Sequence, residues 1–238
     1  MLVLGIETAT PQVSVAIGGH EGVLGLFEVA RGRHHAEALV PAIDFVCRQT
    51  GMTMRDIGVV AVDIGPGLFT GMRVGIAAAK AIAQALRVPM IGISSLDLLA
   101  FPQRRAERLV VPVIDARRGE VYYAAYRSVP GGVQQVVEPT VASPDDLIAD
   151  LLARSDEVLC VGDGARAYRD RITAAVSKID IADQASPYPS AAPLVRLAHA
   201  KAMREEWVQP SALEPMYLRK PDAQINWSTR ATSGRSAP

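Results

Sequence analysis

The sequence predicts an α/β protein made of two successive copies of a βββαβα unit. Short runs of β-forming residues alternate along the 238-residue chain with segments that carry apolar residues at helical spacing. The order strand, strand, strand, helix, strand, helix covers residues 2–86 and is repeated over residues 109–176. The two copies share little sequence, so the repeat is one of topology.

The first copy begins with two β-rich runs joined by the polar turn 7–12. Gly51 can end the first helix, and Pro41 inside that helix predicts a kink or a later start. Thr70 is the expected cap of the second helix. The predicted strands are residues 2–6, 13–17, 23–29, 59–64 and 88–93, and the predicted helices are residues 36–49 and 71–86 and a short helix from Ser95.

The second copy repeats this order, with Ser143 available as a helix cap. Its predicted strands are residues 109–114, 121–126, 133–137 and 158–162, and its predicted helices are residues 144–153, 165–176 and 190–206. Duplicated units of this kind are the plan of the actin-like, Hsp70 and sugar-kinase (ASKHA) superfamily, which binds nucleotide between its halves. We expect subdomains at residues 1–100 and 101–189, with helix 190–206 packing back on the first, and a flexible polar tail at residues 222–238.

Acidic and basic residues balance at 25 each, so no global basic field would draw the chain onto a nucleic-acid backbone. Binding to a nucleic acid would need a local basic patch or a partner protein. Cys47 and Cys160 lie in apolar contexts without a CxxC pattern, which argues against a zinc site or a disulfide. No signal-type segment opens the chain, and polar residues interrupt its longest apolar helix. We therefore expect no membrane contact and a cytoplasmic location.

The turn after the first strand has only part of the chemistry of a phosphate-binding turn. In the actin-like plan, an acid at this turn holds a metal-bound water, and backbone N–H groups face a phosphate. The turn here contains Glu7, Thr8 and Thr10 but lacks the glycines that let the backbone close on a phosphate. A structural turn is favoured over a working kinase turn. Glu7 and Thr8 stay candidates for a residual nucleotide contact.

The segment Asp63–Gly71 follows a buried strand and precedes a helix. Gly65 and Gly67 on either side of a proline make a rigid turn, and the positive end of the next helix points toward it. Such a turn can hold an anion, with these two glycines as contacts. It can equally serve only to bring the helix close to its sheet, and the residues leave both readings open.

Small residues recur every four positions along the second helix. One row must pack inside the monomer, but two small rows are more than one sheet contact needs. The pattern therefore favours close contact between this helix and a helix of another chain. The two rows are Gly71, Gly75, Ala79 and Ala83, and Ala77, Ala81 and Ala85.

No constellation of a hydrolase or of a metal site is visible. The chain has neither a GxSxG elbow nor an HExxH motif. His34 and His35 are adjacent on a helix and point about 100° apart, so one metal cannot easily use both. His34 and Glu37 can instead meet at the start of the helix. We predict no metal and no catalytic residue.

With these residues in view, the chain resembles the TsaB (YeaZ) family from Leu2 to about Lys220. The loop-and-helix motif together with the Asp-Ala-Arg turn, in this order and spacing, is the specific part of the match. Glu7 stands where Asp is usual, and Leu68 where Ser is common, which bears on ligand contact more than on fold. The matching segments are residues 5–10, 35–41, 65–75, 92–96, 115–122 and 215–219.

The resemblance implies a non-catalytic subunit in the synthesis of threonylcarbamoyladenosine at adenosine 37 of tRNAs that read codons beginning with A. It implies pairing with the catalytic paralogue TsaD, with the ATPase TsaE joining, tRNA reached through the complex, and self-association through the same helices. It implies no intrinsic cofactor, with ATP and magnesium only in the complex. The implied interface residues are Leu39, Ile43, Val46, Thr70, Gly71, Arg73, Val74, Gly75, Ala78, Ala79 and Ile82.

Two other functions are kept as alternatives. An ATP-dependent small-molecule kinase of the same superfamily would need an adenosine loop, for which residues 161–165 (Val-Gly-Asp-Gly-Ala) are the one candidate; an ordinary strand-to-helix turn is preferred. A glycoprotease-type peptidase would need metal ligands that the sequence does not show. The arginines weighed as direct tRNA contacts, against solvated surface charge, are Arg31, Arg33, Arg73, Arg117 and Arg118.

Overall fold

The computed structural model describes residues 1–32, 34–183 and 186–219. The first half of the chain forms β1 (Leu2–Glu7), β2 (Gln12–Gly19), β3 (Gly22–Ala30), α1 (His35–Thr50), β4 (Ile57–Asp63), α2 (Phe69–Leu86), β5 (Met90–Ile93) and α3 (Ser95–Ala100). The second half forms β6 (Leu109–Arg117), β7 (Glu120–Val129), β8 (Gly132–Ala142), α4 (Pro144–Leu152), β9 (Val158–Val161), α5 (Asp163–Ala167), α6 (Arg169–Ala175), β10 (Ile179–Ile181) and α7 (Ala191–Ala202). Single 3-10 turns lie at Met54–Asp56, Phe101–Gln103 and Pro210–Ala212.

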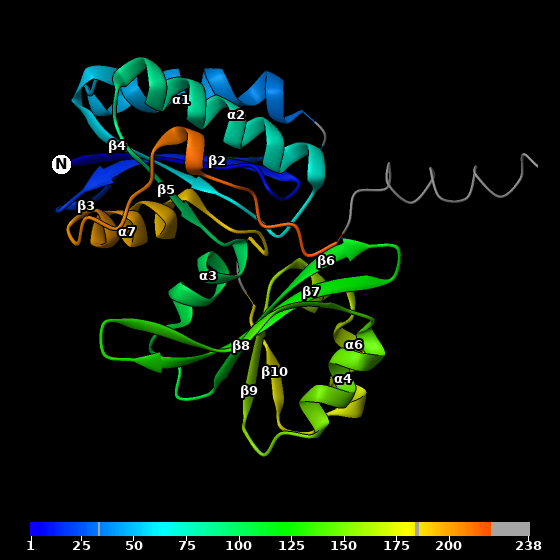
Figure 1. Ribbon diagram of the computed structural model, residues 1–238. Coiled ribbons are helices and arrows are strands. Elements are labelled where there is room, and N and C mark those ends of the chain that lie inside the picture. Colours follow the sequence, from blue (N-terminus) through cyan, green and yellow to red (C-terminus); the bar gives the residue numbers. More distant parts are fainter. Residues whose placement is uncertain (33, 184–185, 220–238) are drawn as a thin grey trace, which may run out of the picture.

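The strands make two five-stranded sheets with the orders β3-β2-β1-β4-β5 and β10-β9-β6-β7-β8. In both, the first strand of the half pairs antiparallel with the second strand and parallel with the strand that follows the first helix. The predicted duplicated α/β fold is confirmed, since both halves repeat the actin-like, Hsp70 and sugar-kinase plan. Figure 1 shows the halves one above the other, with α3 between them.

Each face of the first sheet is covered by helices because its strands are apolar on both sides. Leu4 and Ile6 of β1 pack under α1 and α2, whereas Val3 packs against α7. Helix α7 thus returns from the second half to the first sheet. In the second half, α4, α5 and α6 cover one face, and α3 covers the other, where Asp97 accepts a hydrogen bond from the Tyr126 hydroxyl. Among the described residues, no helix is long and apolar enough to cross a membrane.

Some local predictions were wrong for identifiable reasons. Thr70 does not cap α2: the helix already begins at Phe69, after Leu68, whose N–H donates to Ala9. Of the kink or later start predicted from Pro41, the later start is wrong: α1 begins at His35 and continues past an exposed Pro41.

In the second half, the helix expected over residues 165–176 is two short helices with a break at Tyr168. Strand β10 was missed because three residues are too short to carry a period. The tail expected at residues 222–238 lies outside the described residues.

Candidate functional site

The turn after β1 is closed by its own acidic side chain. Glu7 is fully buried, and its Oε1 accepts hydrogen bonds from the backbone N–H groups of Ala9 at 2.7 Å and Thr10 at 3.3 Å. These are the amides that would face a phosphate in a working nucleotide turn. Because Oε1 of Glu7 already accepts from both amides, neither of the two is free to bind a phosphate.

The start of α2 then covers this turn. The Leu68 N–H donates to the Ala9 carbonyl at 2.6 Å, and the Thr8 hydroxyl donates to the Gly71 carbonyl at 2.8 Å. A Cβ atom added at Gly67 would lie 2.1 Å from the Ala9 carbonyl oxygen, and one at Gly71 would lie 2.2 Å from that of Thr8. Glycine is needed here because helix and turn touch through their backbones.

Burial therefore corrects the proposed nucleotide contacts. Glu7 and Thr8 are 0% and 2% exposed, and Gly65 is buried too, so none of the three can reach a ligand in this structure. Gly67 is half-buried and faces Ala9. Of the two readings of the loop, the close approach of helix to sheet accounts for its glycines.

Glu7 and Asp63 form an unusual pair of buried carboxyl groups. Burial, with the charge of Asp63 second, raises the pKa of Glu7 well above its ordinary value. Burial also raises the pKa of Asp63 to about 7, although hydrogen bonds from Ser95 and Gly65 oppose this. Oε2 of Glu7 is buried without a hydrogen-bond partner. A proton on Glu7 removes a charge that nothing around it compensates.

The described residues contain no group of three or more His, Cys, Asp or Glu side chains placed to hold a metal. His35 is buried, and its Nε2 donates to the Thr10 carbonyl at 2.6 Å. His34 contacts Glu37 at 2.9 Å at the start of α1, the arrangement that their spacing indicates. Both histidines thus have structural partners.

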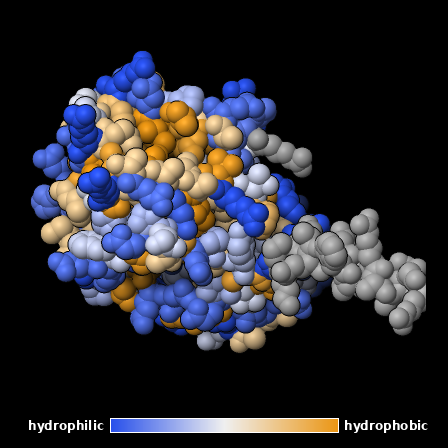
Figure 2. All heavy atoms as spheres, turned by 45° about the horizontal axis from the view of Figure 1, so that its top comes forward, coloured by the Kyte–Doolittle hydropathy of each residue, from blue (hydrophilic) through white to orange (hydrophobic). Residues whose placement is uncertain are grey.

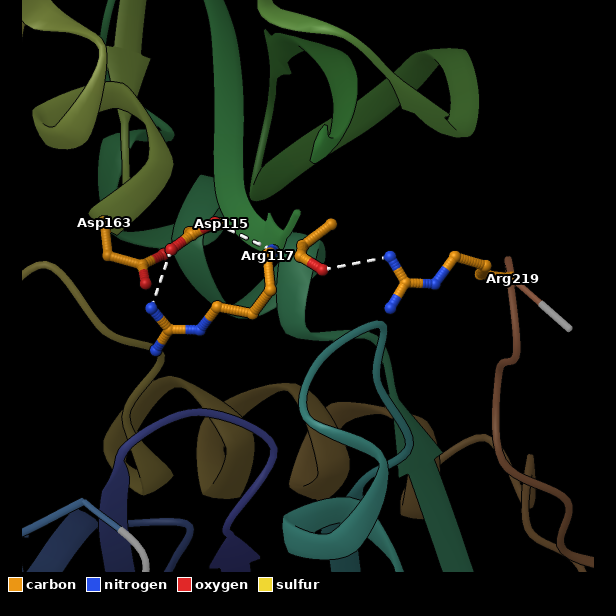
Figure 3. Close-up of polar contacts among 5 residues, drawn as sticks. Asp115, Arg117, Asp163 and Arg219 are labelled. Carbon is orange, nitrogen blue, oxygen red and sulfur yellow. Dashed lines mark hydrogen bonds and ion pairs between the residues drawn. The ribbon is translucent and has the colours of Figure 1, made fainter. Parts of the chain in front are cut away.

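The second half faces this turn with the hairpin between β6 and β7 (Figure 3). Arg117 and Arg118 have φ angles of 64° and 58°, a left-handed backbone that side chains rarely adopt. Asp115 stabilises it by accepting from the Arg117 backbone N–H and guanidinium at 2.8 and 2.9 Å. Asp163 accepts from the Asp115 N–H, and burial raises the pKa of Asp163 to about 6. Arg219 donates to the Ala116 carbonyl from the other side.

The glycine loop considered for adenosine has a packing explanation. A Cβ atom at Gly162 would lie 2.3 Å from the Val113 carbonyl oxygen, and one at Gly164 would lie 2.9 Å from the carbonyl carbon of Ile114. Both glycines therefore let the loop after β9 lie directly on β6, as an ordinary strand-to-helix turn does.

The predicted interface residues fall into two groups. The structure places Leu39, Ile43, Val46, Gly71, Gly75 and Ala79 inside the first half, so these six were assigned to the wrong side of their helices. Thr70 and Arg73 are exposed, and Val74, Ala78 and Ile82 are half-buried. The second small row of α2 is the outward one, because Ala77, Ala81 and Ala85 are exposed.

The sequence reasoning missed the large apolar side chains of this surface. Val40 and Phe45 on α1 are 68% and 48% exposed, and Phe69 at the start of α2 is 38% exposed. We call these three residues, with the exposed alanines of α2, the α1–α2 face; Phe45 lies on its β3 side, where its ring is 5.8 Å from that of Phe27. Figure 2, in which the top of Figure 1 comes forward, shows hydrophobic side chains gathered on the upper part of the molecule. Helical periodicity could not have revealed it, because Val40 and Phe45 are five residues apart on α1 and do not form one stripe.

The edge of this face is an ordered stack of exposed side chains. The Arg73 guanidinium carbon lies 3.7 Å from the centre of the Phe69 ring, and its Nε donates to the Tyr217 hydroxyl at 3.1 Å. The two aromatic rings are 5.5 Å apart. Arg73 is thus held in place on the surface. Arg31 is exposed too, and Arg33 lies outside the described residues.

These features define a class: an actin-like duplicated fold whose first phosphate turn is closed by its own carboxylate and by α2, and which exposes an apolar helical face. Comparison with known proteins refines it. A family model described as TsaD: tRNA N6-adenosine threonylcarbamoyltransferase matches residues 26–227.

The relatives agree over nearly the whole chain. The Escherichia coli tRNA threonylcarbamoyladenosine biosynthesis protein TsaB is 31% identical, covering 92% of this chain and 95% of its own length. The Bacillus subtilis protein of that name is 29% identical, covering 95% and 98%. A Pseudomonas aeruginosa crystal structure, described as an uncharacterized protein with similarity to peptidase YeaZ, has a TM-score of 0.80 at 28% identity, covering 92% and 99%. The chain belongs to the TsaB (YeaZ) family of threonylcarbamoyladenosine biosynthesis proteins.

Proposed function

We propose that the chain is a non-catalytic scaffold and activator in the synthesis of N6-threonylcarbamoyladenosine at adenosine 37 of tRNAs that read codons beginning with A. The names of its relatives support the pathway. In this proposal the chain pairs with a TsaD-like catalytic paralogue in the cytoplasm, a TsaE-like ATPase joins them, and tRNA is reached through the complex. ATP and magnesium act only in the assembled complex.

The observation that carries this proposal is the closed turn after β1. Glu7 takes up the Ala9 and Thr10 amides, and α2 covers them. A kinase would need these donors for the phosphates of ATP. The isolated chain is therefore expected to hydrolyse no ATP above background in a phosphate-release assay with magnesium. Steady turnover that scales with enzyme concentration would support the kinase alternative instead.

The α1–α2 face supports a protein partner. Val40, Phe45 and Phe69 are exposed on α1 and at the start of α2, α2 also carries a row of exposed alanines, and alanine lets a second helix approach closely. A TsaD-like paralogue suits this surface because it has the same fold and can present the corresponding helices. The same complementarity allows two copies of this chain to pair when the paralogue is absent.

Changing Val40 or Phe45 to Glu is expected to weaken association with the TsaD-like partner by about tenfold or more, since each places a charge in an apolar contact. Isothermal titration calorimetry on the purified partners measures this directly, and light scattering of the variant alone reports on the homodimer. Val40 is 68% exposed, so the fold should tolerate its change; Phe45 is 48% exposed and its ring contacts Phe27, so circular dichroism checks that its variant is folded.

Leu152→Glu is the matched control. Leu152 is 57% exposed on α4 of the other half, and the variant should bind the partner within about twofold of the wild type. Undiminished binding by the double variant Val40→Glu/Phe45→Glu would refute the assignment of this face.

Reconstitution tests the function itself. A TsaD-like subunit, a TsaE-like ATPase, tRNA and threonylcarbamoyl-adenylate are expected to give modified adenosine 37 only when this chain is added. Mass spectrometry of nucleosides reads the product. The Val40→Glu/Phe45→Glu variant should fail to restore it, while Leu152→Glu should restore it fully. Equal product without the chain would contradict an activating role.

A further inference from the structure

A hollow lies at the end of the first sheet opposite the closed turn. The register of β1 and β2 pairs Glu7 with Ser14 and Val3 with Gly18, so the β2–β3 turn is at the far end of β1 from Glu7. That turn, the segment after α3 and helix α7 bound a hollow of about 730 Å³. None of its lining residues belongs to the loops at the cleft between the halves.

Basic side chains from three separate segments meet in this hollow. Arg104 and Arg196 both lie over the ring of Phe101, with their guanidinium carbons 4.7 and 5.7 Å from its centre. His20 and His199 also line the hollow, with their rings 6.3 Å apart. Two arginines and two histidines thus line one surface hollow.

Little in the protein balances this charge. Within the described residues, neither Arg104 nor Arg196 has an ion pair with a carboxylate, and Glu21 is the one acidic side chain in the lining. Burial and the neighbouring charges of Arg196 and Arg105 lower the pKa of Arg104. Two like charges that share one ring and lack a counter-charge are suited to an anion that bridges them.

We propose that the hollow binds a phosphate-bearing ligand, with the phosphate held between Arg104 and Arg196. Arginine is suited to this role because its planar fork of donors matches phosphate oxygens. The volume exceeds that of a phosphate alone, and the exposed Pro102 adds an apolar contact for a sugar or base. Free nucleotides and the backbone of RNA both offer this chemistry. Because acidic and basic residues balance over the whole chain, attraction of a phosphate depends on a local cluster of this kind.

Titration of the full chain with inorganic pyrophosphate by isothermal calorimetry tests the site. We expect saturable binding that Arg196→Gln weakens by about tenfold or more, since a charge-assisted contact is lost. Arg196 is exposed, so its replacement should leave the fold intact by circular dichroism. Arg105→Gln is the control. It removes one positive charge from a residue that is next to Arg104 but does not line the hollow, and should change the affinity for pyrophosphate by less than about twofold.

Absence of binding at millimolar pyrophosphate, or equal weakening by Arg196→Gln and Arg105→Gln, would overturn the proposal. The source of the phosphate is separated by two further probes. If it is RNA, a labelled RNA hairpin should bind by fluorescence anisotropy, lose affinity in Arg196→Gln, and be displaced by pyrophosphate. If it is a nucleotide, AMP or ATP should bind more tightly than pyrophosphate with the same dependence on Arg196. Val40→Glu should affect neither probe, because the α1–α2 face is elsewhere.

Discussion

Replacing Gly71 by valine is expected to lower the free energy of unfolding by about 3 kcal/mol or more, because it overpacks a backbone contact. A Cβ atom there would lie 2.2 Å from the Thr8 carbonyl oxygen. Neither the helix nor the turn can move freely, because the Thr8 hydroxyl donates a hydrogen bond to the Gly71 carbonyl and the Ala9 N–H donates one to Glu7. The loss should outweigh the gain of about 0.5 kcal/mol that valine brings over glycine as a helix former. The free energy of unfolding is measured by urea denaturation, with circular dichroism as the signal.

Ala77→Val on the same helix is the control for added bulk. Ala77 is exposed, so its variant should stay within about 0.5 kcal/mol of the wild type. Equal stability of the Gly71 and Ala77 variants would mean that α2 does not press on the turn as described. Gly75→Leu should behave like Gly71→Val, because a Cβ atom there would meet the Thr8 hydroxyl oxygen at 2.3 Å.

Glu7→Gln is expected to stabilise the protein at pH 8 by about 1 kcal/mol or more, because a neutral amide avoids the cost of burying the Glu7 charge or of keeping its proton at that pH. The pKa of Glu7 is raised well above 4.5 and that of Asp63 to about 7, so the folded state binds more protons than the unfolded state above about pH 4. Stability is therefore fully present below the unfolded pKa values and is lost as the pH rises through the raised ones. Glutamine carries no charge, and its oxygen can still accept from Ala9 and Thr10.

Chemical denaturation at pH 5, 6, 7 and 8 checks this prediction. The wild type should lose stability over this range, and Glu7→Gln should lose less. Glu107→Gln, at an exposed site in the other half, should run parallel to the wild type. A wild-type profile that rises from pH 5 to pH 8, or a variant that is equally destabilised at every pH, would contradict a protonated Glu7.

Periodicity predicted which residues of α2 share a face but not which face points inward. Both rows of small residues are compatible with a tight contact, and only the position of Thr8 under Gly71 and Gly75 decides between them. The duplicated fold was predictable because long apolar runs and turns repeat in order. The burial of Leu39 and the exposure of Val40 depend instead on the rotation of α1 about its axis, which the sequence constrains weakly when both sides carry apolar residues.

The sites were harder to predict than the fold because their residues are distant in sequence. The acid and the hydroxyls of the first turn were recognised. The hydrogen bond from the Ala9 N–H to Glu7 was not, because it depends on the Glu7 side chain folding back onto its own turn. His20, Arg104 and Arg196 meet only through tertiary packing, so no local pattern marks them.

The last described segment, residues 213–219, contacts both halves of the protein. Leu213 packs into the core under α2, Leu218 packs against the core of the second sheet, and Arg219 is bonded to Ala116. Together with the passage through α3 and the return into α7, the chain crosses between the halves three times. Enzymes that close around a ligand swing their domains about a hinge, and three chain crossings oppose such a swing between the two halves. A partner would meet a preorganised surface, and the entropic cost of docking falls accordingly.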